Sequence, residues 1–293
     1  MQYGFVYPGG EARAAAEAAH EAEAAGWDGF FVWDPVWGVD AWVSLAAAAM
    51  RTERVRLGTM ITPVSRYRPW QLANALTTLD RLSHGRAILA VGLGAIDTGF
   101  IQFGEVTERK VRAELLDEGL EILTGLWRGQ PFRYDGQHYH VKETTFFPPP
   151  PPVQAPRVPI WVVGAWNWPR SMARALRYDG LLPYKLNPDK SSGPIGPGDV
   201  RAMRAYIAQH RPEAGPFEIV LEGRTTDYTD AAALARIEAL AQAGATWWLE
   251  ALWGEVEAAM TYNAAAGTLD AAAQERIRAR IRQGPPKAAP RTT

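Results

Sequence analysis

Short apolar runs alternate along the chain with longer amphipathic stretches. The clearest amphipathic stretch is 108–127, where Val111, Leu115 and Leu120 belong to a set of apolar residues spaced three or four apart, the period of one helix face. The apolar runs predict strands at 2–7, 28–33, 55–61, 87–93, 159–164, 179–183, 217–221 and 246–249. The stretches between and after them predict helices at 11–25, 39–50, 70–82, 108–127, 170–177, 200–210, 231–243 and 269–282.

Strands that alternate with helices form parallel sheets, and this number of units suits a closed barrel. The chain has 293 residues, above the roughly 250 typical of such a barrel, so it has room for insertions. We therefore predict an α/β fold, a single (β/α)8 TIM barrel over 1–283, with insertions after strands 4 and 6 and a disordered tail over 284–293. The alternative is a doubly wound sheet, but the first turn, 8–10, lacks the phosphate-loop pattern of that fold. A small hairpin is expected around 134–137.

Composition narrows the class of function. The net charge of −1 gives no general attraction to nucleic acid or to anionic membranes. The chain has no cysteine, which excludes disulfides and thiolate catalysis, and its histidines lack metal-ligand spacing, so we predict no metal site. No apolar run reaches about 18 residues, and the first residues lack the pattern of a signal peptide. We expect a cytoplasmic protein without nucleic-acid or membrane partners.

In a (β/α)8 barrel, the functional side chains stand at the C-terminal ends of the strands. Asp34 ends strand 2 and could accept a hydrogen bond from a ligand, move a proton, or cap the next turn. Gly92 and Gly94 end strand 4 and would let a flat or phosphorylated ligand approach the backbone, or would form a tight turn. Gly164 and Ala165 end strand 5, where backbone N–H groups could hold a phosphate or belong to a plain strand-to-helix turn.

Aromatic side chains at the same ends are candidates for the wall of a substrate pocket, with core packing as the alternative. They are Trp33, Trp37, Tyr67, Trp166 and Trp253. Further polar candidates at strand ends are Arg66, Asn167 and Glu250.

Several segments resemble the motifs of one family in the same order. They are 24–34 (AAGWDGFFVWD), 56–63 (RLGTMITP), 78–86 (TLDRLSHGR), 90–94 (AVGLG) and 159–164 (PIWVVG). Together they resemble the luciferase-like monooxygenases, the bacterial luciferase-like flavin-dependent oxidoreductases. The resemblance runs over about 1–183 and is much weaker from residue 184 onward.

The resemblance implies that FMN or the deazaflavin F420 binds in the barrel mouth beside a small-molecule substrate. It also implies a homodimer and a flavin reductase or F420 reductant as partner. In the family the isoalloxazine ring rests on a bulge formed by a non-proline cis peptide, which by position is Thr59–Met60. Thr62 would then face the polar edge of the ring. The other implied cofactor contacts are Gly92 and Gly94 along the channel, and Gly164 and Ala165 at the phosphate.

One departure from the family pattern bears on catalysis. The family usually has Asp-His at the end of strand 2, where this chain has Asp34-Pro35, and proline cannot transfer a proton. Asp34 is then the catalytic candidate. The sugar-phosphate dehydrogenase branch has a glutamate where this chain has Ala95, so that branch's activity is not expected.

Three functions stay open at this point. The first is an FMN- or F420-dependent oxidoreductase or monooxygenase that acts on a small apolar or aromatic molecule, where the cofactor supplies the chemistry. The second is a flavin-binding barrel with little or no catalysis, because the usual histidine is Pro35. The third, a cofactor-free barrel enzyme, has only Lys185 as a candidate Schiff-base residue.

Overall fold

A closed barrel of eight parallel strands forms the centre of the protein. The computed structural model describes residues 1–145, 148–187, 192–211, 215–225, 230–254 and 271–286. The barrel strands, in order around the barrel, are β1 (Gln2–Tyr7), β2 (Gly29–Val32), β3 (Arg56–Thr59), β5 (Ala87–Gly92), β8 (Ile160–Ala165), β9 (Gly180–Leu186), β11 (Glu218–Gly223) and β12 (Trp247–Ala251). The ring closes because β12 pairs in parallel with β1.

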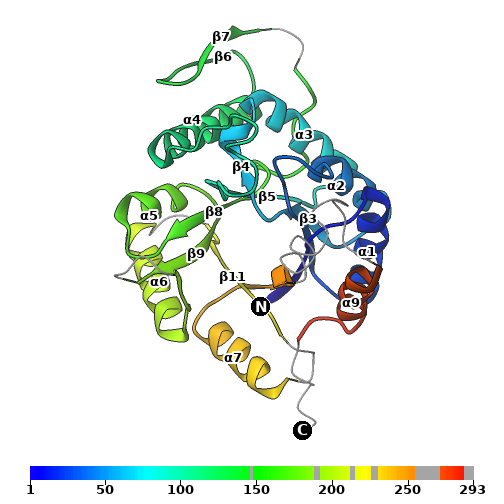
Figure 1. Cartoon of the computed structure of the whole chain (residues 1–293). Helices are drawn as coiled ribbons and strands as arrows, with labels where there is room; N and C mark the ends of the chain where they lie inside the picture. The colour runs from blue at the N-terminus through cyan, green and yellow to red at the C-terminus, as the bar shows by residue number, and fades with distance from the viewer. Residues whose placement is uncertain (146–147, 188–191, 212–214, 226–229, 255–270, 287–293) are drawn as a thin grey trace.

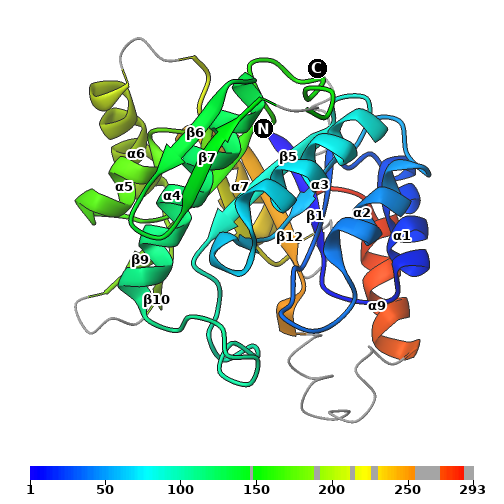
Figure 2. The same cartoon turned by 90° about the horizontal axis from the view of Figure 1, so that it is seen from above.

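Two short strands extend this sheet, and one hairpin lies apart from it. β4 (Thr62–Pro63) continues β3 along β5, and β10 (Ser192–Gly193) pairs antiparallel with β9. The hairpin of β6 (Phe132–Asp135) and β7 (His140–Thr144), expected from the turn signal, lies outside the ring next to the fourth helix (Figure 2).

Helices surround the barrel in chain order (Figure 1). They are α1 (Ala12–Ala24), α2 (Ala41–Ala49), α3 (Pro69–Leu82), α4 (Arg109–Arg128), α5 (Pro169–Ala175), α6 (Pro197–His210), α7 (Ala231–Gln242) and α9 (Ala271–Arg282), with a 3-10 turn η1 (Val64–Arg66) before α3. Helix α9 packs against α1, so the C-terminal helix lies beside the first helix of the chain (Figures 1 and 2).

The predicted barrel is confirmed, because each predicted strand overlaps one barrel strand. The loops after β5 and β9, the fourth and sixth barrel strands, are the two predicted insertions. At the start of the predicted tail, Gly284 donates its N–H to the Ile281 carbonyl (3.0 Å) and Pro286 is buried, and the predicted domain boundary stays a prediction. The rest of that tail, 287–293, lies outside the described residues.

Large aromatic side chains fill the barrel interior below its mouth, which lies at the C-terminal ends of the strands. Phe31, Trp161 and Trp247 contact one another, with ring centroids 5.1–6.1 Å apart. Gly4 and Gly58 make room for the Phe31 ring: a Cβ at Gly4 would lie 2.8 Å from it, and one at Gly58 would lie 3.1 Å from it. The barrel interior is therefore filled by side chains, and a binding site is expected at the mouth.

Asp80 fastens the segment before β8 to the barrel. Its buried carboxylate accepts the backbone N–H groups of Val153 (2.7 Å) and Gln154 (3.0 Å), and the Gln154 side-chain amide (2.7 Å). The same amide donates to the Ala87 carbonyl (2.8 Å), which ties this segment to β5. Three donors thus depend on one carboxylate.

We expect Asp80→Ala to lower the free energy of unfolding by about 3 kcal/mol, because it removes the buried acceptor of three hydrogen bonds. Urea unfolding followed by tryptophan fluorescence measures this. The matched control is Asp135→Ala in the hairpin, a carboxylate whose side chain is 73% exposed, where we expect a change within about 0.5 kcal/mol. Equal losses in the two variants would contradict the role given to Asp80.

Candidate functional site

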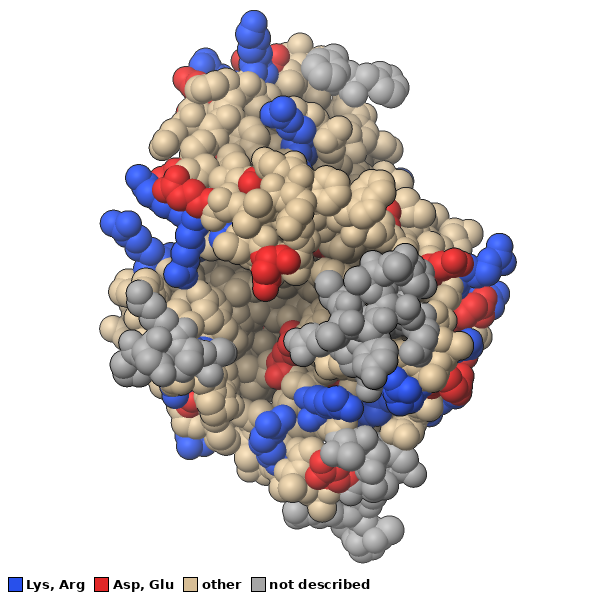
Figure 3. Space-filling model, viewed as in Figure 1, with Lys and Arg blue, Asp and Glu red and all other residues tan. Residues whose placement is uncertain are grey.

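A cavity of about 1320 Å³ opens at the C-terminal ends of the strands. Its barrel side is lined mainly by apolar residues. They are Trp33, Met60, Ile61, Pro63, Leu93, Val163 and Trp253, together with Gly94 and the carboxylate of Asp34. The opposite side is formed by α4 and α5, where Figure 3 shows basic side chains beside the hollow.

The floor of the cavity lies where the third strand leaves the sheet. Met60 still donates its N–H to the Val32 carbonyl (2.8 Å), and Thr62 pairs again with Val91 on β5. Between them the Met60–Ile61 peptide is cis. The sequence-based position, Thr59–Met60, was wrong by one residue, because Met60 keeps its place in the sheet and the chain departs only after it.

A glycine and an arginine shape the edge of this floor. Gly94 has φ +76°, and a Cβ there would lie 2.8 Å from the Phe100 ring and 2.9 Å from Pro63. The Arg112 guanidinium donates to the carbonyls of Leu93 (2.6 Å) and Gly94 (2.9 Å) and lies over the Phe100 ring. The backbone after β5 is therefore held close to the cavity with no side chain in the way.

Asp34 lines the cavity with its side chain anchored from behind. Tyr67 Oη lies 3.0 Å from both carboxylate oxygens. Trp42 Nε1 donates to the same hydroxyl oxygen (3.1 Å), so the Tyr67 proton must point to Asp34. Arg66 Nη1 lies 3.7 Å from Oδ1 of Asp34 and donates to its backbone carbonyl, and Arg66 also donates to the Pro35 carbonyl.

Burial sets the protonation of this group. Asp34 is 4% exposed, and desolvation raises the pKa of its carboxyl to about 6, against the opposing effects of the Arg66 cation and the bonds from Tyr67 and Thr62. The pKa of Tyr67 is raised by burial and by the nearby Asp34 charge, which keeps its hydroxyl protonated. Asp34 can therefore take up or release a proton near neutral pH.

The two threonines predicted as cofactor contacts lie behind Asp34. Thr59 and Thr62 are fully buried, and their hydroxyl oxygens are 2.7 Å apart. Thr62 also hydrogen-bonds Asp34. Neither residue is among those that line the cavity, so the structure places them as supports of Asp34, and their contact with a cofactor stays a prediction.

Strand alternation separates two glutamates at neighbouring strand ends. Glu222 follows the inward-facing Val220 on β11 and accepts a hydrogen bond from Trp253 Nε1 (2.8 Å). Its pKa is raised by desolvation, although its side chain keeps exposed surface at the mouth. Glu250 instead points outward, where its carboxylate accepts from Thr225 N–H (2.7 Å) and has no exposed surface. Glu222 is thus a mouth residue that sequence reasoning did not select, and Glu250 is not part of the mouth.

The predicted aromatic wall is only partly assembled. Trp33 and Trp253 line the cavity, and Tyr67 reaches it only through Asp34. Trp166 turns outward and packs edge-on against Tyr206 of α6. Trp37 stands on the rim, 81% exposed.

The end of β8 does not offer free backbone donors. The Ala165 N–H donates to Ser171 Oγ (2.9 Å), and a Cβ at Gly164 would lie 2.4 Å from Leu181 of β9. Gly92, similarly, is buried under Ile61 and Val163, where a Cβ would lie 2.5 Å from Ile61 Cδ1. The predicted contacts of Gly92, Gly164 and Ala165 with a cofactor stay predictions.

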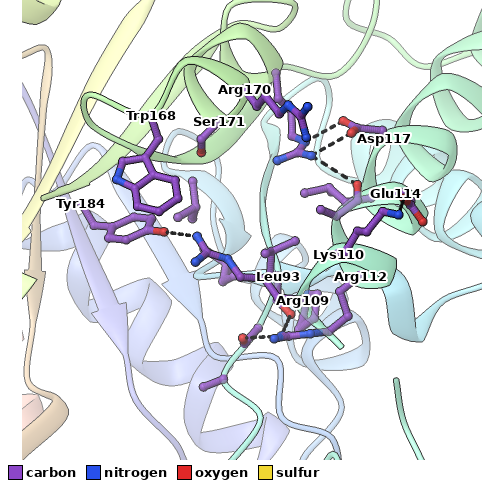
Figure 4. A pocket seen from close by; sticks show the side chains of 18 of the residues that line it. Leu93, Arg109, Lys110, Arg112, Glu114, Asp117, Trp168, Arg170, Ser171 and Tyr184 are labelled. Carbon is purple, nitrogen blue, oxygen red and sulfur yellow. Dashed lines mark hydrogen bonds and ion pairs between the residues drawn. The ribbon is translucent and has the colours of Figure 1, made fainter. Parts of the chain in front are cut away.

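Cations of α4 and α5 form the wall that sequence reasoning missed (Figure 4). They are Arg109, Lys110 and Arg112 on α4, Arg170 and Arg174 on α5, and Arg177 just after α5. Arg174 is engaged in a two-point ion pair with Asp117 (2.6 and 2.7 Å), and Arg177 pairs with Glu121.

Three of these cations lack a close ion pair among the described residues and can still bind an anionic ligand. Arg109 donates to the neutral Tyr184 hydroxyl (3.0 Å) and lies over the Trp168 ring. Lys110 has only a 3.7 Å pairing with Glu114. Arg170 is exposed and makes no hydrogen bond or ion pair with the described residues. The wall can therefore hold an anionic group.

The family model for luciferase-like monooxygenases matches residues 2–291. The predicted resemblance is confirmed, and it extends beyond residue 183 to nearly the whole chain. Among curated relatives, a protein of uncharacterized function from Mycobacterium tuberculosis is 37% identical over 127 residues, 43% of each chain. An F420-dependent glucose-6-phosphate dehydrogenase from Nocardia farcinica is 42% identical over 104 residues, which cover 34% of this chain and 30% of the relative. The matches thus span less than half of these relatives.

Solved structures share the fold. An F420-dependent secondary alcohol dehydrogenase in complex with an F420-acetone adduct has a TM-score of 0.69 at 19% identity, and covers 85% of this chain and 93% of its own. The oxygenating constituent of 3,6-diketocamphane monooxygenase from Pseudomonas putida, in complex with FMN, has a TM-score of 0.59 at 20% identity, over 76% and 67%. These homologues are F420-dependent and FMN-bound enzymes, which agrees with the predicted choice of FMN or F420.

Proposed function

Because this chain belongs to the luciferase-like monooxygenase family, we propose that it is an oxidoreductase that binds FMN or F420 in the mouth cavity and acts on a small organic molecule. One observation carries the proposal: the cavity joins an apolar floor at Met60 and Ile61 to a basic wall on α4 and α5. A flat ring with an anionic tail has the same two parts.

The residues present fit such a group. Met60, Ile61 and Val163 offer an apolar surface to a ring, and Gly94 leaves its edge free of a side chain. Arg109 and Arg170 lie on the wall that would receive the phosphate and its tail.

The basic wall favours F420 over FMN. FMN ends in a single phosphate, whereas F420 carries a phosphodiester followed by glutamate carboxylates. Arg109, Lys110 and Arg170 supply more positive charge than one phosphate requires, and they extend outward along α4 and α5. FMN remains the second candidate, supported by the same floor.

Asp34 supplies the proton chemistry in this proposal. When bound, F420 accepts a hydride from a substrate carbon or returns one, and reduced FMN supplies electrons to dioxygen. For an alcohol substrate, Asp34 would take the hydroxyl proton as the carbonyl forms, and for a carbonyl substrate it would return that proton. Tyr67 and Arg66 would hold the carboxylate in place, and the aromatic rings of Trp33 and Trp253 would exclude water.

Asp34 also distinguishes this proposal from a barrel that binds the cofactor without catalysis. Pro35 removes the usual histidine, but the pKa of Asp34, about 6, gives the site a proton carrier of its own. The non-catalytic alternative predicts cofactor binding without turnover of any alcohol or carbonyl compound.

Assembly and partners belong to the same proposal. We expect a homodimer formed through helices of the first half, supported by exposed Val43 and Met50 on α2 and at its end. A flavin or F420 reductant would be a separate protein. Among the described residues, no helix combines the length and the apolar character needed to cross a membrane.

We expect Arg170→Glu to weaken F420 binding about tenfold at low ionic strength, with a smaller effect at high salt, because the changed charge is exposed. Fluorescence titration with F420 measures this at two salt concentrations. Arg133→Glu, an exposed residue of β6 outside the cavity, is the matched control and should not change the affinity. Equal affinities for wild type and Arg170→Glu would remove α5 from the binding site.

A further inference from the structure

Two loops meet at the rim of the cavity through exposed apolar side chains. Trp37, after β2, stacks on Phe103, after β5, with ring centroids 5.9 Å apart and planes at 27°. Trp37 is 81% exposed and Phe103 is 56% exposed, and Ile101 beside them is also exposed. Such a patch on a protein surface usually marks a binding site.

The rim continues into the cavity wall. Phe100, on the same loop as Phe103, is 1% exposed and lines the cavity. Backbone bonds from Phe103 N to the Gly99 carbonyl (3.1 Å) and from Glu105 N to the Phe100 carbonyl (2.8 Å) fold the loop on itself. The exposed ring of Phe103 therefore lies on a loop that its own backbone hydrogen bonds hold together and whose residue Phe100 lines the cavity.

The charged side chains on the Asp34 side of the mouth, opposite α4 and α5, disfavour an anionic substrate. Asp34 lines the cavity there, and Arg66 is already engaged with Asp34 and with two carbonyls. Glu222 accepts a hydrogen bond from the cavity-lining Trp253, and neither Glu222 nor the nearby Arg224 is among the residues that line the cavity. Within the described residues, the cations that line the cavity lie on α4, on α5 or, for Arg177, just after α5.

We propose that the substrate is an uncharged molecule with an apolar arm, whose reacting group lies by Asp34 while the arm crosses the Trp37–Phe103 pair. This inference rests on the proposed function, since it assigns the α4 and α5 wall to the cofactor. A phosphorylated sugar fits less well, because a phosphate beside the reacting group would face the carboxylate of Asp34. The arm would replace water on the two rings and gain affinity with each added methylene.

The test uses the full chain and a neutral apolar dye, Nile red, followed by fluorescence with and without cofactor. We expect saturable binding that 2-octanol displaces and glucose 6-phosphate does not. Trp37→Ser and Phe103→Ser should each weaken the dye by about tenfold, since each removes half of the apolar contact. Trp70→Ser, a partly exposed tryptophan on α3, is the matched control and should leave binding unchanged.

Four results would overturn the proposal. They are a lack of saturable dye binding, equal dye binding by the rim variants and wild type, displacement by glucose 6-phosphate, and a dimer that the rim variants convert to monomer in sedimentation, which would show that a second copy covers the rim. Failure of the proposed function gives a different signature: wild type then binds neither cofactor, while the dye assay without cofactor still reports on the rim.

Discussion

Asp34→Asn should lower kcat/KM about 10²- to 10⁴-fold, the usual effect of removing a general acid or base, with cofactor affinity unchanged. Asparagine keeps the shape of the side chain and still accepts the Tyr67 hydroxyl, but it cannot carry the proton. The measurement is steady-state turnover with any substrate that wild type converts, together with a cofactor titration of both proteins. Full activity in the variant would assign the proton transfer to another group.

The pH profile makes this prediction specific. In the direction that releases a substrate proton, wild-type activity should rise with pH through about 6, the pKa of Asp34, because only the carboxylate can accept a proton. The variant should lack this rise. A rise of the same midpoint in Asp34→Asn would show that a different group titrates.

Asp34→Asn should also change how the stability of the protein depends on pH. The pKa of Asp34 is raised from 3.8 to about 6, so the folded protein holds this proton more tightly than the unfolded chain. The resulting stability is fully present below pH 3.8 and is lost as the pH rises through about 6, with a total change of about 3 kcal/mol. We therefore expect Asp34→Asn to melt at a higher temperature than wild type at pH 8. Near pH 4 the melting temperatures of the two proteins should be nearly equal.

Gly94→Ala should reduce cofactor affinity by at least about tenfold, because its Cβ would lie 2.8 Å from Phe100 and 2.9 Å from Pro63, both of which line the cavity. Fluorescence titration measures the affinity, and circular dichroism checks the fold. Gly104→Ala is the matched control: Gly104 has φ +70° on the same loop, and a Cβ there meets nothing within 4 Å. It bears the same backbone strain without the crowding, so equal losses in both variants would contradict the steric explanation.

The barrel and part of its mouth could be predicted from the sequence because they depend on local patterns. Alternating apolar runs and helical stretches located the strands, and the strand ends located Asp34, Trp33 and Trp253 at the cavity. Alternation along each strand also distinguishes Glu222 from Glu250. Val220 faces inward, so Glu222 does too, whereas the inward Leu249 sends Glu250 outward.

The remaining features depend on packing between distant segments. Arg109 and Arg170 lie far apart in sequence and reach one wall only because α4 and α5 lie side by side. The position of the cis peptide depends on Met60 keeping its bond to Val32 of the neighbouring strand, which nothing in the residues around Met60 reveals. Trp37 was placed in the pocket by its position after strand 2, but its partner Phe103 comes from another loop.

The proposed function requires that the mouth cavity bind a flavin or deazaflavin cofactor. Titration of the purified protein with F420 and with FMN, read by cofactor fluorescence and by thermal unfolding, tests it most directly. We expect saturable one-to-one binding of at least one of them, with F420 the tighter, a raised melting temperature, and weaker binding in Gly94→Ala. Wild-type protein that binds neither cofactor would contradict it.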